Sequence, residues 1–127
     1  MRCKELMLSD WVATEHGFPM QITNVGEDYA YATFEGNEGD PWEFNDKDDQ
    51  PYPIPLTYEI LKKNGWKDAE FWCEYEEGNN SIQACLPSMR GIITGVEIEL
   101  FKCEYVHQYQ HLLRLCGLDE LADNFKI

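Results

Sequence analysis

The sequence predicts an α+β fold, in which N-terminal SH3-like strands precede an antiparallel sheet that is packed by two helices. Three patterns support this prediction: short apolar runs with a two-residue period, a hairpin in the middle of the chain, and an amphipathic helix near its end. A chain of 127 residues is of single-domain size. We therefore expect one domain over residues 1–127, with a β half at about 1–50 and an α+β half at about 51–127.

The first part of the chain holds three strand-like segments. Leu6–Val12 is typical of a turn that leads into a strand, and Met20–Val25 and Tyr29–Phe34 are predicted as the next two strands. Gly26–Asp28 has the composition of a tight hairpin loop between them. Short, twisted strands in this order favour an SH3-like half-barrel, and a simple meander is the alternative.

An acidic segment and a proline-rich segment follow. Glu35–Asp49 carries seven acids opposed only by Lys47, so we predict a solvated surface loop. It is no EF-hand, because counting from Asp46 places Pro51 where that motif needs glycine. The three prolines of Gln50–Leu56 predict an extended connector.

A short helix is predicted after the connector. Thr57 suits its N-cap, and Leu56 and Leu61 stand at the two positions of a hydrophobic staple. Asn64 and Gly65 should end this helix after about two turns.

The central hairpin is predicted to turn at Asn79 and Asn80, because asparagine tolerates positive φ. That register sets one apolar face and places Cys73 and Cys85 on opposite faces, which argues against a disulfide between them. The apolar face comprises Phe71, Cys73, Tyr75, Ile82, Ala84 and Leu86.

Gly91–Phe101 is predicted as further strand, in which Val96, Ile98 and Leu100 alternate with Glu97 and Glu99. A helix should follow with almost no linker. We expect that helix to pack across an apolar face formed by Phe71, Tyr75, Ile82, Leu86, Ile98 and Leu100.

This last helix is the most informative segment. A core-facing stripe at helical spacing comprises Tyr105, Tyr109, Leu112, Leu113 and Cys116. Gly117 follows as a left-handed C′ residue would, and Arg114 complements the helix dipole in the last turn.

The other side of the same helix carries a dense band of imidazole and amide groups. Such side chains suit protein contacts, because they bury area at little entropic cost. The candidate binding residues are Tyr105, His107, Gln108, Gln110, His111 and Arg114. The alternative is that the band only caps the neighbouring sheet, with His107 and Gln110 hydrogen-bonded to backbone.

Metal binding and catalysis are not expected. His107 and His111 are one turn apart, and Cys103 would align with them if the helix began early enough, but Gln108 stands where the HExxH motif needs glutamate. A nucleophilic pair of Cys103 or Cys116 with a histidine is conceivable. The chain has no glycine-rich phosphate loop, nucleophile elbow or metalloprotease motif, so we predict a non-enzymatic protein without metal or cofactor.

Charge and cysteine usage narrow the partner class. The formal net charge is −14, from 24 acids and 10 bases, which repels nucleic-acid phosphates and anionic lipids. We expect a protein partner of basic character and no direct contact with nucleic acid or membrane. Five cysteines without a CxxC pair indicate buried thiols in a reducing, cytoplasmic compartment. The sequence does not specify an oligomeric state.

A second class of function is a counter-defence inhibitor. As a DNA mimic, the chain would space acids at phosphate-like intervals along one face. As a sink for a nucleotide signal, it would need an aromatic pocket lined by Arg90, Arg114 or His111.

Three segments carry a resemblance to a known group of proteins. Glu5–Val12, Pro53–Trp66 and Tyr105–Gln110 resemble small uncharacterised proteins encoded by phages and mobile elements of Bacteroides-like gut bacteria. The resemblance implies a cytoplasmic bacterial or prophage origin. It leaves the acidic segment and most strands uncovered, and it brings no activity, cofactor or catalytic residue.

Overall fold

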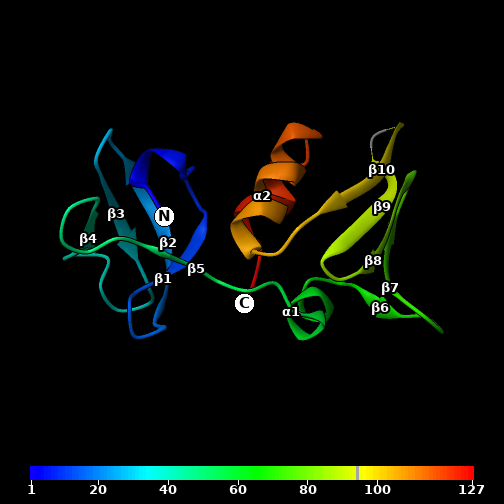
Figure 1. The fold of residues 1–127 in the computed structure, drawn as a ribbon, viewed down its shortest axis with the longest axis horizontal. Coiled ribbons are helices and arrows are strands. Elements are labelled where there is room, and N and C mark those ends of the chain that lie inside the picture. The colour runs from blue at the N-terminus through cyan, green and yellow to red at the C-terminus, as the bar shows by residue number, and fades with distance from the viewer. Residues whose placement is uncertain (94) are drawn as a thin grey trace.

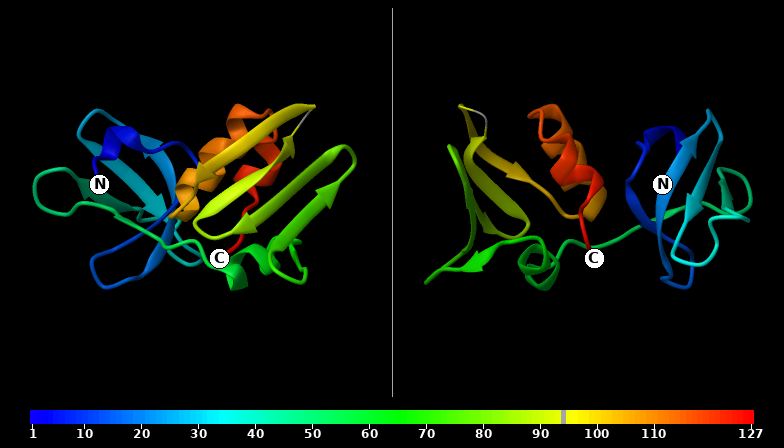
Figure 2. Two further views of the ribbon diagram at one scale, coloured as in Figure 1. Left: turned by 45° about the vertical axis from the view of Figure 1, so that its right-hand side comes forward. Right: turned by 180° about the vertical axis from the view of Figure 1, so that it is seen from behind.

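The computed structural model describes residues 1–93 and 95–127, with the backbone alone at residues 93, 96 and 98–100. In this part of the chain, two five-stranded antiparallel sheets and three α-helices are present, which confirms the predicted α+β class. Helix α2 (Val106–Leu115) stands between the two sheets (Figure 1). Two further views place the sheets on opposite sides of this helix (Figure 2).

The first sheet has the strand order β4-β3-β2-β1-β5. A 3-10 turn, η1 (Cys3–Glu5), precedes it. Its strands are β1 (Trp11–Ala13), β2 (Pro19–Val25), β3 (Tyr29–Thr33), β4 (Trp42–Asn45) and β5 (Tyr52–Pro53). The predicted strands near Met20 and Tyr29 are confirmed, and so is the turn that leads into β1.

The acidic segment is not simply a solvated loop, and that prediction is wrong for β4. Ala30 of β3 lies opposite Phe44, whose side chain is fully buried. The physical reason is a two-residue alternation, in which Trp42 and Phe44 share one face while Glu43 and Asn45 share the other. The density of acids conceals this pattern in the sequence.

The proline-rich connector is extended, as predicted, and it also supplies an edge strand. In β5, Pro53 lies opposite Val12 and Tyr52 lies opposite Ala13. An edge position suits proline, which has no N–H to donate to a second neighbour. The first sheet therefore reaches past residue 50, while the single-domain organisation stays a prediction.

The second sheet has the order β10-β9-β8-β7-β6. Its strands are β6 (Lys67–Asp68), β7 (Cys73–Glu77), β8 (Asn80–Cys85), β9 (Ser88–Ile93) and β10 (Val96–Lys102). The remaining helices of the described chain are α1 (Tyr58–Lys63) and α3 (Asp119–Asp123), of which α3 was not predicted.

The central hairpin turns at Gly78 and Asn79, because Glu77 pairs with Asn80. Gly78 supplies the positive φ of 58°. The predicted turn was one residue too late, which offsets the register by two residues and leaves the side chains of the two paired strands on their predicted faces. Cys73 is accordingly buried and Cys85 exposed, and both are free thiols.

The segment Gly91–Phe101, predicted as further strand, includes the end of β9 and most of β10, which pair as a hairpin that Gly95 helps to turn with φ of 82°. Gly91 sits where a Cβ would lie 2.0 Å from the carbonyl oxygen of Ser81, so only glycine fits there. The predicted alternation of apolar and acidic residues in this segment stays a prediction, because the side chains of Val96, Ile98, Glu99 and Leu100 lie outside those that the structure describes.

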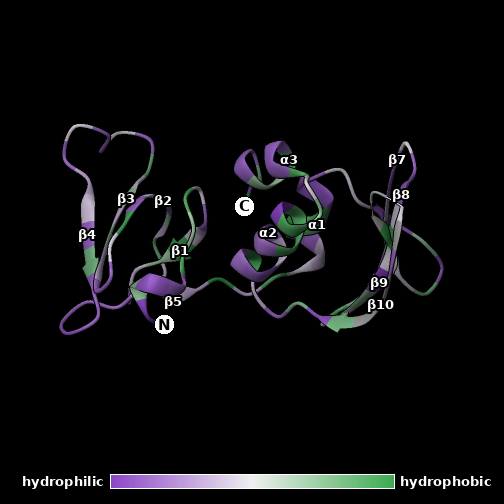
Figure 3. Cartoon of the chain, turned by 90° about the horizontal axis from the view of Figure 1, so that it is seen from above, coloured by the Kyte–Doolittle hydropathy of each residue, from purple (hydrophilic) through white to green (hydrophobic). Residues whose placement is uncertain are grey.

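Two hydrophobic clusters form the interior. One lies under the first sheet, around Met20, Ile22 and Phe44. The other joins α1, α2 and α3 to the second sheet, through residues such as Leu61, Tyr109 and Ile82. Figure 3 shows the three helices grouped between the sheets.

Phe71 is a correction to the predicted apolar face. Its side chain is 75% exposed, although Tyr75 and Ile82 of that face are buried. Phe71 precedes β7, so it lies beyond the stretch that the sheet register holds in place.

The first helix has the predicted boundaries. The Thr57 hydroxyl accepts a hydrogen bond from the backbone N–H of Ile60 at 3.2 Å, and Gly65 follows the helix with φ of 92°. No helix within residues 1–93 and 95–127 is long and apolar enough to cross a membrane.

Candidate functional site

Helix α2 is held at both ends, at its start by Gln108, which was predicted as a binding residue, and at its end by Gly117, which was predicted as the C-cap glycine. At its start, Gln108 Oε1 accepts hydrogen bonds from the backbone N–H of Glu104 at 2.8 Å and of Tyr105 at 3.1 Å. At its end, Gly117 adopts φ of 78°, and the N–H of Leu118 reaches the carbonyl of Leu113 at 2.8 Å. The predicted glycine C-cap is confirmed as a Schellman motif.

Cys103 lies before this helix, so it does not continue the line of His107 and His111. The helix begins at Val106 and its N-cap is Tyr105. Among the residues described, no group of three or more His, Cys, Asp or Glu side chains is placed to hold a metal ion.

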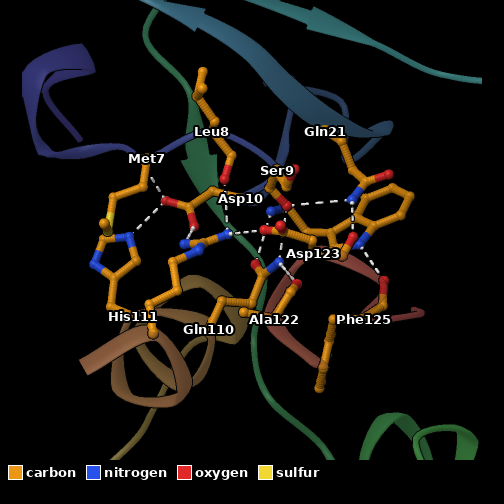
Figure 4. A network of polar contacts seen from close by, with 12 residues as sticks. Met7, Leu8, Ser9, Asp10, Gln21, Gln110, His111, Ala122, Asp123 and Phe125 are labelled. Carbon is orange, nitrogen blue, oxygen red and sulfur yellow. Dashed lines mark hydrogen bonds and ion pairs between the residues drawn. The ribbon is translucent and has the colours of Figure 1, made fainter. Parts of the chain in front are cut away.

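Gln110 is fully buried, although it was expected on an exposed binding surface. Its Oε1 accepts a hydrogen bond from the backbone N–H of Trp11 at 2.9 Å, and its Nε2 donates to the carbonyls of Ser9 at 2.8 Å and Ala122 at 2.9 Å. Figure 4 shows these contacts converging on one amide. Gln110 thus joins α2, α3 and the turn before β1, which excludes it from a docking surface.

Asp10 is the centre of the same network, and its carboxylate is fully buried. Oδ1 lies 2.6 Å from Nη1 of Arg114, and Oδ2 lies 2.6 Å from Nε2 of His111. Oδ2 also accepts the backbone N–H of Met7 at 2.8 Å. A buried carboxylate needs such charged and hydrogen-bonding partners, and α2 supplies two of them.

Arg114 is almost fully occupied within the chain. Besides Asp10, its guanidinium donates through Nη2 to the carbonyl of Leu8 at 2.7 Å and lies 3.6 Å from Asp123. Its side chain is only 11% exposed. Arg114 therefore serves the contact between α2 and the first sheet rather than an external partner.

The turn that presents Asp10 depends on an unusual backbone at Ser9. Ser9 has φ of 69°, and it is the non-glycine residue with positive φ in the described chain. Its N–H donates to the carbonyl of Ile22 at 2.7 Å, while its own carbonyl accepts from Gln110 and from Gln21. This conformation turns one carbonyl toward α2 and places the next side chain, Asp10, in the interior.

Within the imidazole and amide band, His107 has a buried ring nitrogen that makes no hydrogen bond to the described residues. Its Nδ1 is buried without a partner among the described residues, and burial, more than any charge, lowers the pKa of its imidazole. The ring stacks on Tyr105 at a centroid distance of 6.1 Å and meets His111 edge-on at 5.6 Å. The alternative role as a backbone-bonded cap is confirmed for Gln110 only.

The thiols near α2 are poorly suited to nucleophilic chemistry. Burial raises the pKa of Cys103 to about 12, and it also raises the pKa of Cys116. A thiolate is the reactive form of cysteine, and both sites disfavour it.

The residues expected in a nucleotide pocket do not come together. Arg114 and His111 face Asp10, whereas Arg90 is in the second sheet, where its Nε donates to Gln83 Oε1 at 3.3 Å. Arg90 and Trp72 line a hollow of about 150 Å³. Small-molecule sites usually measure about 300–1,000 Å³, so this hollow is too small for a nucleotide.

Sequence reasoning missed the role of Asp10 at the centre of this network. The available signal was an acid between the apolar pairs Met7-Leu8 and Trp11-Val12, which is a typical setting for a buried and therefore paired charge. Its partner Arg114 lies 104 residues away, and no local pattern connects the two.

Comparison of the chain with protein-family models, with curated proteins and with solved structures found no match. Functional inference therefore depends on the residues of this chain.

Proposed function

We propose that the chain is a non-enzymatic accessory protein that binds a basic protein partner, chiefly through the surface of its first sheet. The observation that carries this proposal is the excess of acids over bases, which is greater in the first half: residues 1–56 contain 12 acids and three bases, whereas residues 57–127 contain 12 acids and seven bases. The same segment exposes aromatic side chains, among them Phe18 at 48% and Trp42 at 42%.

Charge and exposed rings serve different steps of association. A surface of one sign steers an oppositely charged protein and raises the association rate. Aromatic side chains supply the buried anchors that dominate binding free energy. Tyr29 and Tyr31 add an edge-to-face ring pair at 5.7 Å on β3, directly opposite Glu43 and Asn45 of β4.

The imidazole and amide band contributes less to this surface than the sequence indicated. Gln110 and Arg114 are used within the chain, which leaves Tyr105, His107, Gln108 and His111 as a second, smaller contact area. His111 keeps 26% of its side chain exposed beside the Asp10 network.

Other parts of the proposal are supported by the sequence and by the topology. The raised thiol pKa values near α2 favour a non-enzymatic role. The strand order β4-β3-β2-β1-β5, in which β5 returns to β1, supports an SH3-like half-barrel. The resemblance of three segments to phage and mobile-element proteins supports a prophage origin and a cytoplasmic location.

The excess of acids over bases also favours a DNA mimic as a second candidate, since a mimic is an acidic protein that occupies a basic groove. The two candidates differ in where the partner is bound. A mimic competes with duplex DNA for its partner, whereas an accessory protein leaves DNA binding by the partner unaffected.

The experiment is capture of partners from a bacterial host lysate on the immobilised chain, followed by mass spectrometry and titration calorimetry with the purified partner. We expect a basic protein whose affinity falls as ionic strength rises. The double variant Glu27→Gln/Glu43→Gln should weaken binding more than Glu70→Gln/Glu76→Gln, which removes the same charge from the second half of the chain. Equal effects of the two variants, or a partner that binds independently of salt, would contradict the proposal.

A further inference from the structure

A hollow on the first sheet lies beside the point where β2 begins and β3 ends. Its volume is about 630 Å³. Side chains that line it include Trp11, Phe18, Pro19, Phe34, Glu35 and Glu38. Its floor is therefore apolar and aromatic, and its rim carries two carboxylates.

We propose that this hollow is the docking site for a segment of the basic partner that carries an arginine next to an apolar side chain. The inference rests on the proposed function and adds the chemistry of the segment that is recognised. Charge complementarity supports it: Glu35 and Glu38 are both exposed, and the described lining includes no Lys, Arg or His.

The aromatic floor suits a guanidinium group. Phe18 and Phe34 meet edge to face, with centroids 4.8 Å apart and planes at 71°. Phe34 packs against the core of the first sheet, while Phe18 is 48% exposed and offers a free ring surface. A planar guanidinium stacks on such a ring and also donates paired hydrogen bonds to a carboxylate, which a lysine ammonium does less well.

Two of the side chains that line the hollow are fixed before any partner arrives. Trp11 Nε1 donates to the carbonyl of Phe125 at 2.6 Å, so the indole is held in one orientation. Gln21, its cross-strand neighbour, donates to the carbonyls of Ser9 at 3.2 Å and Asp123 at 3.4 Å. A preformed site loses little conformational entropy on binding.

The rim keeps carboxylate oxygens for a ligand. Glu38 Oε2 accepts the backbone N–H of Gly36 at 3.0 Å, which orients this side chain. An ionised carboxylate has two oxygens and accepts several hydrogen bonds at once. The hydrogen bond from Gly36 therefore positions the Glu38 carboxylate and leaves it able to accept further hydrogen bonds from a ligand.

The test is an amide NMR titration of the full chain with a capped Gly-Arg-Phe-Gly peptide and with the same peptide carrying citrulline, the neutral isostere of arginine. We expect shifts centred on the lining residues and an affinity at least about threefold lower for the citrulline peptide. Phe18→Ala and Glu35→Gln/Glu38→Gln should each lower the affinity for the arginine peptide by a similar factor, whereas Glu70→Gln/Glu76→Gln should leave that affinity unchanged. Unchanged backbone spectra outside the hollow would show that each variant is folded.

Equal affinities for the two peptides would contradict the proposed docking site. An equal loss of affinity for the arginine peptide in the hollow variants and in the control variant would contradict it as well. The partner from the lysate separates this failure from failure of the proposed function. If that partner still binds Phe18→Ala and Glu35→Gln/Glu38→Gln at full strength but loses affinity for Glu27→Gln/Glu43→Gln, the docking site is wrong and the proposed function stands.

Discussion

Arg114 on α2 places its guanidinium nitrogen Nη1 2.6 Å from Oδ1 of Asp10, which is buried in the turn before β1. The two residues are 104 positions apart, so this pair connects α2 to the first sheet. The two hydrophobic clusters share no buried residue in the described chain. Trp11 of β1 packs against the edge of the second cluster, and the network around Asp10 adds specific polar contacts between the two halves.

Asp10→Asn should destabilise the chain by about 3–5 kcal/mol, because it leaves the guanidinium of Arg114 without its counter-charge in a buried position. Urea unfolding followed by tryptophan fluorescence measures this change. Asp123→Asn is the control, since Asp123 lies 3.6 Å from the same guanidinium but is 53% exposed. That substitution should cost less than about 1 kcal/mol. A similar loss of unfolding free energy in both variants would show that the buried pair contributes no more to stability than the exposed pair.

Gln110→Leu should cost about 2–4 kcal/mol, because it removes the partner of the Trp11 N–H and of the Ser9 and Ala122 carbonyls at once. Gln108→Leu is a matched change two residues away on the same helix. It removes only the acceptor of the exposed backbone N–H groups of Glu104 and Tyr105 and should cost about 1 kcal/mol. The denaturant midpoints of the two variants are compared, and Gln110→Leu should have the lower midpoint. A lower midpoint for Gln108→Leu would contradict the role of Gln110.

His107 should make stability depend on pH. An exposed histidine has a pKa of about 6.5, and burial lowers the pKa of His107 below that value in the folded chain. As pH falls through about 6.5, the unfolded chain takes up a proton that the folded chain resists, so stability declines until pH reaches the folded pKa. Above the unfolded pKa, this group contributes no pH dependence.

His107→Leu should therefore flatten the dependence of the unfolding free energy on pH below about pH 6.5. Nearby charges that act on this imidazole include Asp10 and Glu5, which raise its pKa, and His111, which lowers it. His16→Gln, at an exposed position, is the control for the removal of one histidine. An unaltered slope in His107→Leu would assign the pH dependence to other groups.

Ser9→Gly should be tolerated, with a change in stability within about 0.5 kcal/mol, because glycine adopts the observed φ of 69° without strain. Ser9→Val should cost about 1–3 kcal/mol, since a β-branched residue is strained in that region and would displace Asp10 from α2. Thermal melts of both variants provide the measurement. Comparable melting temperatures would show that this backbone conformation does not fix the turn.

Local chemistry in the sequence predicted local structure well. Thr57, Gly65 and Gly117 mark helix ends through caps that need only adjacent residues. The hairpin turn was misplaced by one residue, but side-chain parity survived, so Cys73 and Cys85 occupy the predicted faces.

Features that depend on distant residues were not accessible in the same way. Phe44 is buried only because β3 pairs with β4, and its acidic neighbours outweigh that signal in any prediction based on charge. Gln110 was predicted as a binding residue, with a backbone-bonded cap as the alternative, because an amide on a helix has the same local pattern whether it meets solvent or the backbone of Trp11. Tertiary contact decides between the two, and it depends on the turn at Ser9.

The most direct test of the link between the halves is a double-mutant cycle of Asp10→Asn and Arg114→Gln, with unfolding free energies measured in urea. Because the two side chains contact each other, we expect the double variant to be more stable than the sum of the single losses implies, with a coupling of about 2 kcal/mol or more. A coupling below about 0.5 kcal/mol would mean that the two side chains act independently, and would contradict the claim that the polar side of α2 binds the first sheet.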